Sequence, residues 1–77
     1  MTSTEVIRYV ADQVTTDGVI VDATSDGVRV EPADHHRHPV VLVWSGHPDD
    51  SNEITLYQQR VVDLAESMAR PAVVAGR

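Results

Sequence analysis

Histidine and aspartate side chains gather at two places near the middle of the chain, and these residue types hold metal ions or transfer protons. Asp34-His35-His36-Arg37-His38 places three imidazoles within four residues, and His47-Pro48-Asp49-Asp50 places one histidine beside two carboxylates. Imidazole is the commonest metal ligand in proteins, and carboxylates bind metals or act as general bases. The first group predicts a metal site, and the second raises the question of a hydrolytic zinc centre.

The segment VVLVWSGHPDD, residues 40–50, resembles the first strand and loop of the zinc-dependent deacetylases of the LmbE-like family, which includes sugar-amide deacetylases. The resemblance implies that His47 and Asp50 bind zinc and that Asp49 activates a zinc-bound water. Ser51 stands where the family has glutamate, and no histidine follows His47 to supply the third ligand. A turn followed by N-cap and helix-dipole carboxylates explains the same residues, so we expect no enzyme and no cofactor here.

The histidines at 35–38 give the alternative function of a zinc- or nickel-binding regulatory or accessory protein. Its ligands would be His35, His36 and His38. At about 3.3 Å per strand residue, roughly 20 Å separate His38 from His47, so the two histidine groups cannot share an ion within one chain.

Length and composition restrict the classes of function. A chain of 77 residues without cysteine forms one small domain with no disulfide or thiolate zinc site to stabilise it, so a homodimer is expected. The net charge is −6 and all six basic residues are arginines, which disfavours direct nucleic-acid binding and favours a protein partner, including a basic one. No long apolar run or signal peptide is present, so we expect a soluble cytoplasmic protein without membrane contact.

The fourteen valines, eight aspartates and absence of lysine indicate a GC-rich genome. In composition the chain resembles small phage gene products of actinobacterial hosts, which implies a phage-encoded or accessory protein that binds a host protein.

The order of patterns predicts an α+β domain, α-β-β-β-α, with two helices packed on one face of a three-stranded antiparallel sheet. A capping box at residues 2–5 starts the first helix, and Gly18 is expected to end it with a left-handed cap. Residues 19–24 and 28–32 alternate as a hairpin, with Asp26-Gly27 supplying positive φ, and apolar residues recur at helical spacing over 51–70. We expect a domain over residues 1–70 and a flexible tail over 71–77.

In element order and length, this arrangement is similar to the double-stranded-RNA-binding domain. That family grips the RNA backbone with lysines in the first hairpin turn and at the second helix. This chain has Ser25-Asp26 in the turn and Asp49, Asp50 and Glu53 at the helix, and acids at those positions repel phosphate.

The segment VVLVW, residues 40–44, is apolar on both faces of a strand. Either this strand is central in the sheet, or its second face meets another chain. The primary prediction is therefore a non-enzymatic, small acidic protein-interaction module. Its expected contact residues are Val41, Val43, Trp44, Tyr9 and Leu56. A further alternative is an acidic mimic of nucleic acid built from Asp12, Asp17, Asp22 and Asp26.

Overall fold

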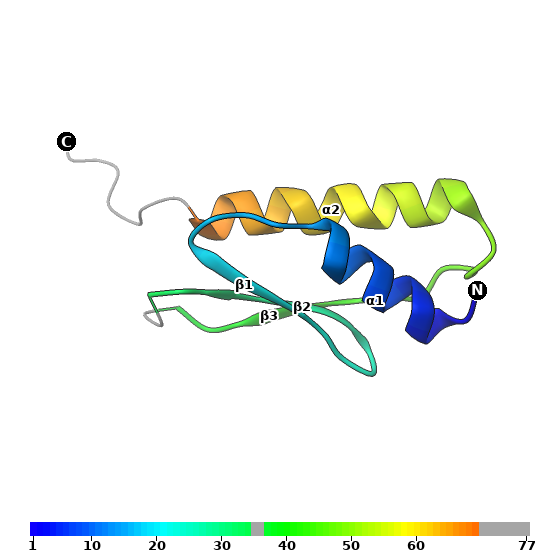
Figure 1. Ribbon diagram of the computed structural model, residues 1–77, viewed down its shortest axis with the longest axis horizontal. Coiled ribbons are helices and arrows are strands. Elements are labelled where there is room, and N and C mark those ends of the chain that lie inside the picture. The colour runs from blue at the N-terminus through cyan, green and yellow to red at the C-terminus, as the bar shows by residue number, and fades with distance from the viewer. Residues whose placement is uncertain (35–36, 70–77) are drawn as a thin grey trace.

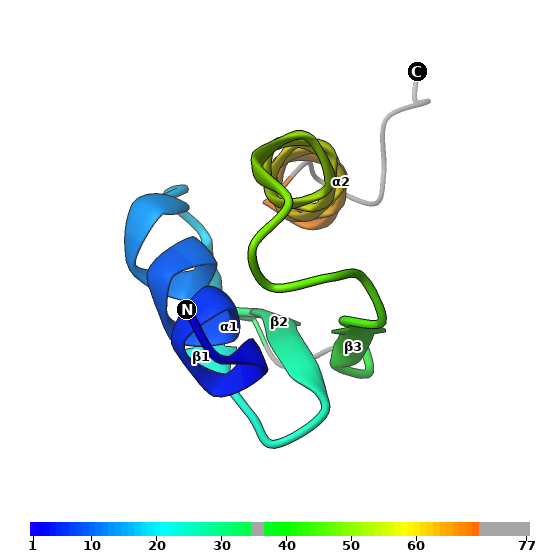
Figure 2. The ribbon, with the colours of Figure 1, turned by 90° about the vertical axis from the view of Figure 1, so that its right-hand side faces the viewer.

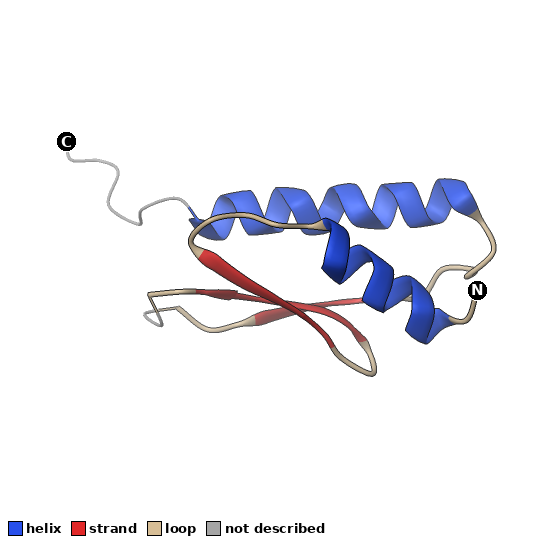
Figure 3. Ribbon diagram, in the orientation of Figure 1, coloured by secondary structure: helices blue, strands red, loops and turns tan. Residues whose placement is uncertain are grey.

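The computed structural model describes residues 1–34 and 37–69 (Figure 1). The elements follow in the order helix α1 (Ser3–Gln13), strands β1 (Val19–Ala23), β2 (Gly27–Pro32) and β3 (Val40–Val43), and helix α2 (Ser51–Ala69). Figure 3 separates the helical layer from the strands. The predicted α+β class and the α-β-β-β-α order are confirmed. The predicted tail, residues 71–77, lies outside the described residues.

The sheet has the order β1-β2-β3, and both neighbouring pairs are antiparallel. Helix α1 contacts β1 and β2, while α2 contacts β2 and β1, and Figure 2 shows both helices beside the sheet. Val28 and Val30 of β2 are fully buried beneath them, whereas the intervening Arg29 on the other face is not. The alternation of β2 thus provides one face for the core and one outer face.

The core joins both helices to the sheet. Its buried members are Val6, Ile7, Val10, Val14, Val28, Val30, Trp44, Tyr57, Val61, Ala65 and Met68. The predicted helical stripes are confirmed in outline, although Ile54 and Leu64 are only half-buried. Ala23, which the alternation of β1 assigns to the core side, is exposed.

Helix α1 begins at the predicted capping box. The Glu5 amide donates to Thr2 Oγ1 at 3.1 Å, and the Thr2 amide donates to Glu5 Oε1 at 2.7 Å. The hydrogen bond from the Thr2 backbone is the main reason why the pKa of the Glu5 carboxyl lies below its ordinary value. A hydrogen bond with the Thr2 side chain lowers this pKa further. The helix ends earlier than the glycine cap predicts, because Val14 is the C-cap and its extended backbone still donates to Val10. Gly18 has φ +89° but lies in the turn before β1.

The turn between β1 and β2 is organised by Thr24. Its Oγ1 donates to the Gly27 carbonyl at 2.7 Å and accepts from the Asp26 and Gly27 amides at 3.2 and 3.1 Å. Among the described glycines only Gly18 has a positive φ, so the predicted left-handed role of Gly27 is wrong. Gly27 is required for a different reason: a Cβ at this position would lie 1.9 Å from the Leu42 carbonyl oxygen.

Strand β3 pairs only with β2 in the described sheet and is therefore an edge strand. A central position, one of the two alternatives given by its apolar faces, is therefore wrong. Of the two explanations for its apolar faces, contact of the second face with another chain remains.

None of the helices within residues 1–34 and 37–69 combines the length and apolar character needed to cross a bilayer.

Candidate interaction surface

The outer face of β3 carries two exposed valines. Val41 and Val43 point away from the helices, and the two residues are 40% and 65% exposed. In the register of the sheet, Val41 lies opposite Arg29 and Val43 lies opposite Gly27 on the same outer face. No charged residue occurs between Val40 and Trp44, so this edge of the sheet is neutral and apolar.

One backbone edge of β3 has no neighbouring strand among residues 1–34 and 37–69, and we call it the free edge. The Trp44 amide donates to the Asp26 carbonyl at 2.9 Å, which directs the backbone groups of Trp44 toward β2. Because hydrogen-bonding direction alternates along a strand, the N–H and C=O groups of Val41 and Val43 point to the side on which the described residues supply no strand. An added strand would find both donors and acceptors there.

Trp44 closes the core just behind this edge. The residue is 9% exposed, and its ring packs edge to face on Tyr57, with ring centroids 5.0 Å apart. Its buried indole Nε1–H has no acceptor among the described residues. Gly46 allows the chain to pass close to the ring, since a Cβ there would lie 2.8 Å from Trp44 Cη2.

A small pocket lies between the end of β3 and one stripe of α2. Its volume is about 170 Å³, and Val43 and Trp44 line it from the strand side. Helix α2 contributes Glu53, Leu56, Tyr57 and Arg60, at the spacing that places residues on one helix face. Leu56 is 66% exposed at this position.

We call Val41, Val43 and Leu56, together with the free edge of β3 and the pocket beside Trp44, the β3 surface. It unites four of the five contact residues expected from the sequence. Tyr9 is exposed elsewhere, in a groove that it lines with Met1 and Ile54. The sequence patterns did not indicate Glu53 and Arg60 as contact residues. Their spacing around Leu56, which places all three on one helix face, is the signal that could have found them.

The segment from His47 to Asp50 leads into α2, and Asp50 is the N-cap of this helix. Asp50 Oδ1 accepts from the amides of Asn52 at 3.0 Å and Glu53 at 3.3 Å, which is the predicted capping role. Glu53 Oε1 in turn accepts from the His47 amide at 3.0 Å. The carboxylate of Asp50 is thus engaged by the backbone at the start of the helix.

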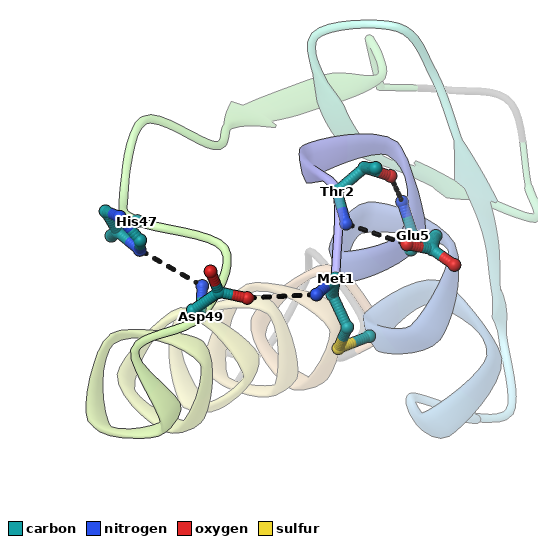
Figure 4. A network of polar contacts seen from close by, with 5 residues as sticks. All are labelled: Met1, Thr2, Glu5, His47 and Asp49. Carbon is teal, nitrogen blue, oxygen red and sulfur yellow. Dashed lines mark hydrogen bonds and ion pairs between the residues drawn. The ribbon is translucent and has the colours of Figure 1, made fainter.

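Asp49 and His47 take part in a second set of contacts (Figure 4). The Met1 ammonium donates to Asp49 Oδ1 at 2.9 Å, and the Asp49 amide donates to His47 Nδ1 at 3.2 Å. The hydrogen bond from the ammonium, aided by its charge, holds the pKa of the Asp49 carboxyl below its ordinary value and raises the pKa of the ammonium. Both groups are exposed, so solvent screens this pair.

Within the described part of the chain, no three histidine or acidic side chains come together in a way that could hold a metal ion. His35 and His36 lie outside the described residues, while His38 is exposed just before β3. The metal site expected at His35, His36 and His38 stays a prediction.

The four aspartates considered for a nucleic-acid mimic are not on one surface. Asp12 and Asp17 line a groove beside the end of α1. Asp22 lies on the outer face of the sheet, where its carboxylate is 3.9 Å from Arg29, and Asp26 lies in the turn at the far end of β1. The structure thus brings together two of the four.

Comparison of the chain with models of protein families, with curated proteins and with solved structures finds no match.

Proposed function

We propose that this chain is a non-enzymatic protein-interaction module that binds a partner protein through the β3 surface. The observation that supports this most directly is an edge strand with no charge, with apolar side chains on both faces and with a row of backbone groups that no strand of the described part of the chain pairs. We expect it to act in the cytoplasm of a cell with a GC-rich genome.

Natural proteins usually block such an edge with lysine, proline, a bulge or a covering segment, because an open edge recruits other strands. In β3 the charged residues are missing, and the exposed valines continue to Leu56 on α2. A partner that adds an extended segment here gains main-chain hydrogen bonds along the strand, and its side chains contact the valines and the pocket. The binding segment of the partner is therefore apolar and extended.

The acidic character of the chain has a separate role in this proposal. Asp12 and Asp17 lie beside α1 and β1, at the opposite edge of the sheet from β3. Their charge favours a basic protein at that opposite edge, which the contact through β3 leaves uncovered.

Affinity capture with matched baits tests the proposal. Purified wild type and Val43→Lys are immobilised and exposed to lysate of a high-GC bacterium, with Ile20→Lys as the control because Ile20 is 41% exposed on the other edge strand. A partner retained by wild type and by Ile20→Lys, but lost by Val43→Lys, is the expected result. Equal capture by all three baits would remove the β3 surface as the binding site.

A further inference from the structure

We infer that the strand which covers the free edge of β3 is β3 of a second copy of this chain, antiparallel to the first across a two-fold axis. This inference rests on the proposed function, since it names the occupant of the same surface. The resulting dimer contains one continuous six-stranded sheet with all four helices on one side.

The strand itself is self-complementary. An isologous contact places the same residues of two copies against one another, so it tolerates no uncompensated charge near the axis. Residues 40–44 are VVLVW, and an antiparallel pair of these segments sets only apolar side chains opposite one another. The outward amide and carbonyl groups of Val41 and Val43 supply the donors and acceptors that each copy needs.

The nearest charges on α2 fit the same symmetry. Glu53, Leu56, Tyr57 and Arg60 line the edge of the pocket that faces β3. If the two-fold axis passes between positions 56 and 57, the α2 helices of the two copies run antiparallel. Glu53 of each copy then faces Arg60 of the other, which gives two such pairs. Leu56 then lies near the axis, where the second copy covers its exposed side chain.

This complementarity selects the second copy as the occupant despite the net charge of −6 on each chain. The groove that contains Asp12 and Asp17 lies beside β1, so these acids are at the opposite edge of the sheet from the contact. The β3 surface itself carries one acid and one base, Glu53 and Arg60. Two copies can meet there without placing like charges together.

Light scattering on purified protein over a range of concentrations tests the inference. The wild type is expected to rise from 8.4 kDa toward twice that mass, and Ile20→Lys should behave in the same way. Val43→Lys should stay at the monomer mass, with an unchanged far-ultraviolet circular dichroism spectrum because Val43 is exposed. A constant mass of 8.4 kDa for the wild type would overturn the inference.

Charge variants test the symmetry. Arg60→Glu places two acids against each other at both ends of the contact and should weaken the dimer at least about tenfold, with the loss reduced at high salt. Arg8→Glu changes the net charge by the same amount on α1, which packs on β1, β2 and α2, and should leave the dimer nearly intact. Equal weakening by both variants would reject the proposed axis.

Cross-linking locates the contact in a chain that has no cysteine of its own. Val43→Cys in each copy should be joined efficiently by a short bis-maleimide. At about 4.8 Å between strands, cysteines at Ile20 lie five spacings, roughly 24 Å, apart in the dimer and should not be joined. If Ile20→Cys cross-links as well as Val43→Cys, the edge-to-edge dimer is wrong.

If no dimer forms, the capture experiment with Val43→Lys still decides whether the β3 surface binds another protein.

Discussion

The hydroxyl oxygen of Tyr57 lies 2.9 Å from the amide nitrogen of Val28 and accepts its hydrogen bond. The same hydroxyl donates to the carbonyl of Leu42, which is the register partner of Val28 on β3. A side chain of α2 therefore joins two paired positions on neighbouring strands. This bond ties the edge strand to the helix that lies above the sheet.

Tyr57→Phe should destabilise the protein by about 1–3 kcal/mol, because it leaves a buried amide and a carbonyl without their shared partner. The phenyl ring and its packing on Trp44 are retained, so the loss reports the hydroxyl. Urea unfolding followed by tryptophan fluorescence measures the change. Tyr9→Phe is the matched control, since its ring is exposed, and should change the free energy of unfolding by no more than about 0.5 kcal/mol. Equal values for the two variants would contradict the bridging role.

Tyr57 should also make the fold sensitive to alkaline pH. Burial raises the pKa of its phenol above the ordinary 10.0, and the bond from the Val28 amide offsets part of that rise. The pKa of this phenol is higher in the folded than in the unfolded protein. The stability that the buried, neutral phenol contributes is therefore complete below the unfolded pKa and is lost as pH rises through the folded pKa.

Absorbance titration of the phenolate in a Tyr9→Phe background isolates this group, because the chain has only two tyrosines. A midpoint at or below 10.0 in the folded protein would show that the hydroxyl is not buried as described.

Gly27→Ala should be more damaging than loss of the Tyr57 hydroxyl. The added methyl group would lie 1.9 Å from the Leu42 oxygen and 2.8 Å from its carbonyl carbon, so β3 must move away from β2. A cost of at least ~3 kcal/mol is expected, at the upper end for single substitutions. Ser25→Ala, at an exposed position in the same turn, serves as the control. Matching urea midpoints for the two variants would disprove the close approach.

Gly27 also illustrates what sequence patterns could predict and what they could not. Alternation and helical spacing depend on local geometry, and they predicted the element order and most of the buried stripes correctly. The Asp26-Gly27 pair signalled a turn, but the need for glycine comes from the distance to Leu42, which is set by the pairing of β2 with β3. Such a contact has no local signature.

The candidate site likewise has features that the sequence could predict and features that depend on how the elements pack. The two apolar faces of residues 40–44 indicated an unusual strand. Val43 and Leu56 are exposed, and their contact role stays a prediction. The pattern left a central and an edge position open, because both give a strand that is apolar on two sides. The partners Glu53 and Arg60 emerged only when the helix was placed beside the strand end.

Substitutions of Asp50 should have different effects if it is a helix cap and if it is a zinc ligand. Asp50→Ala should cost about 0.5–2 kcal/mol of stability, because the amides of Asn52 and Glu53 lose their acceptor. Asp50→Asn should cost much less, since asparagine is an equally good N-cap, whereas a zinc site would lose its anionic ligand in both variants. Thermal unfolding of the three proteins, with added zinc and with chelator, separates these cases. A zinc-dependent rise in melting temperature that both substitutions abolish would make Asp50 a zinc ligand. A loss of stability confined to Asp50→Ala identifies Asp50 as the cap that starts α2, the helix that places Leu56 beside β3.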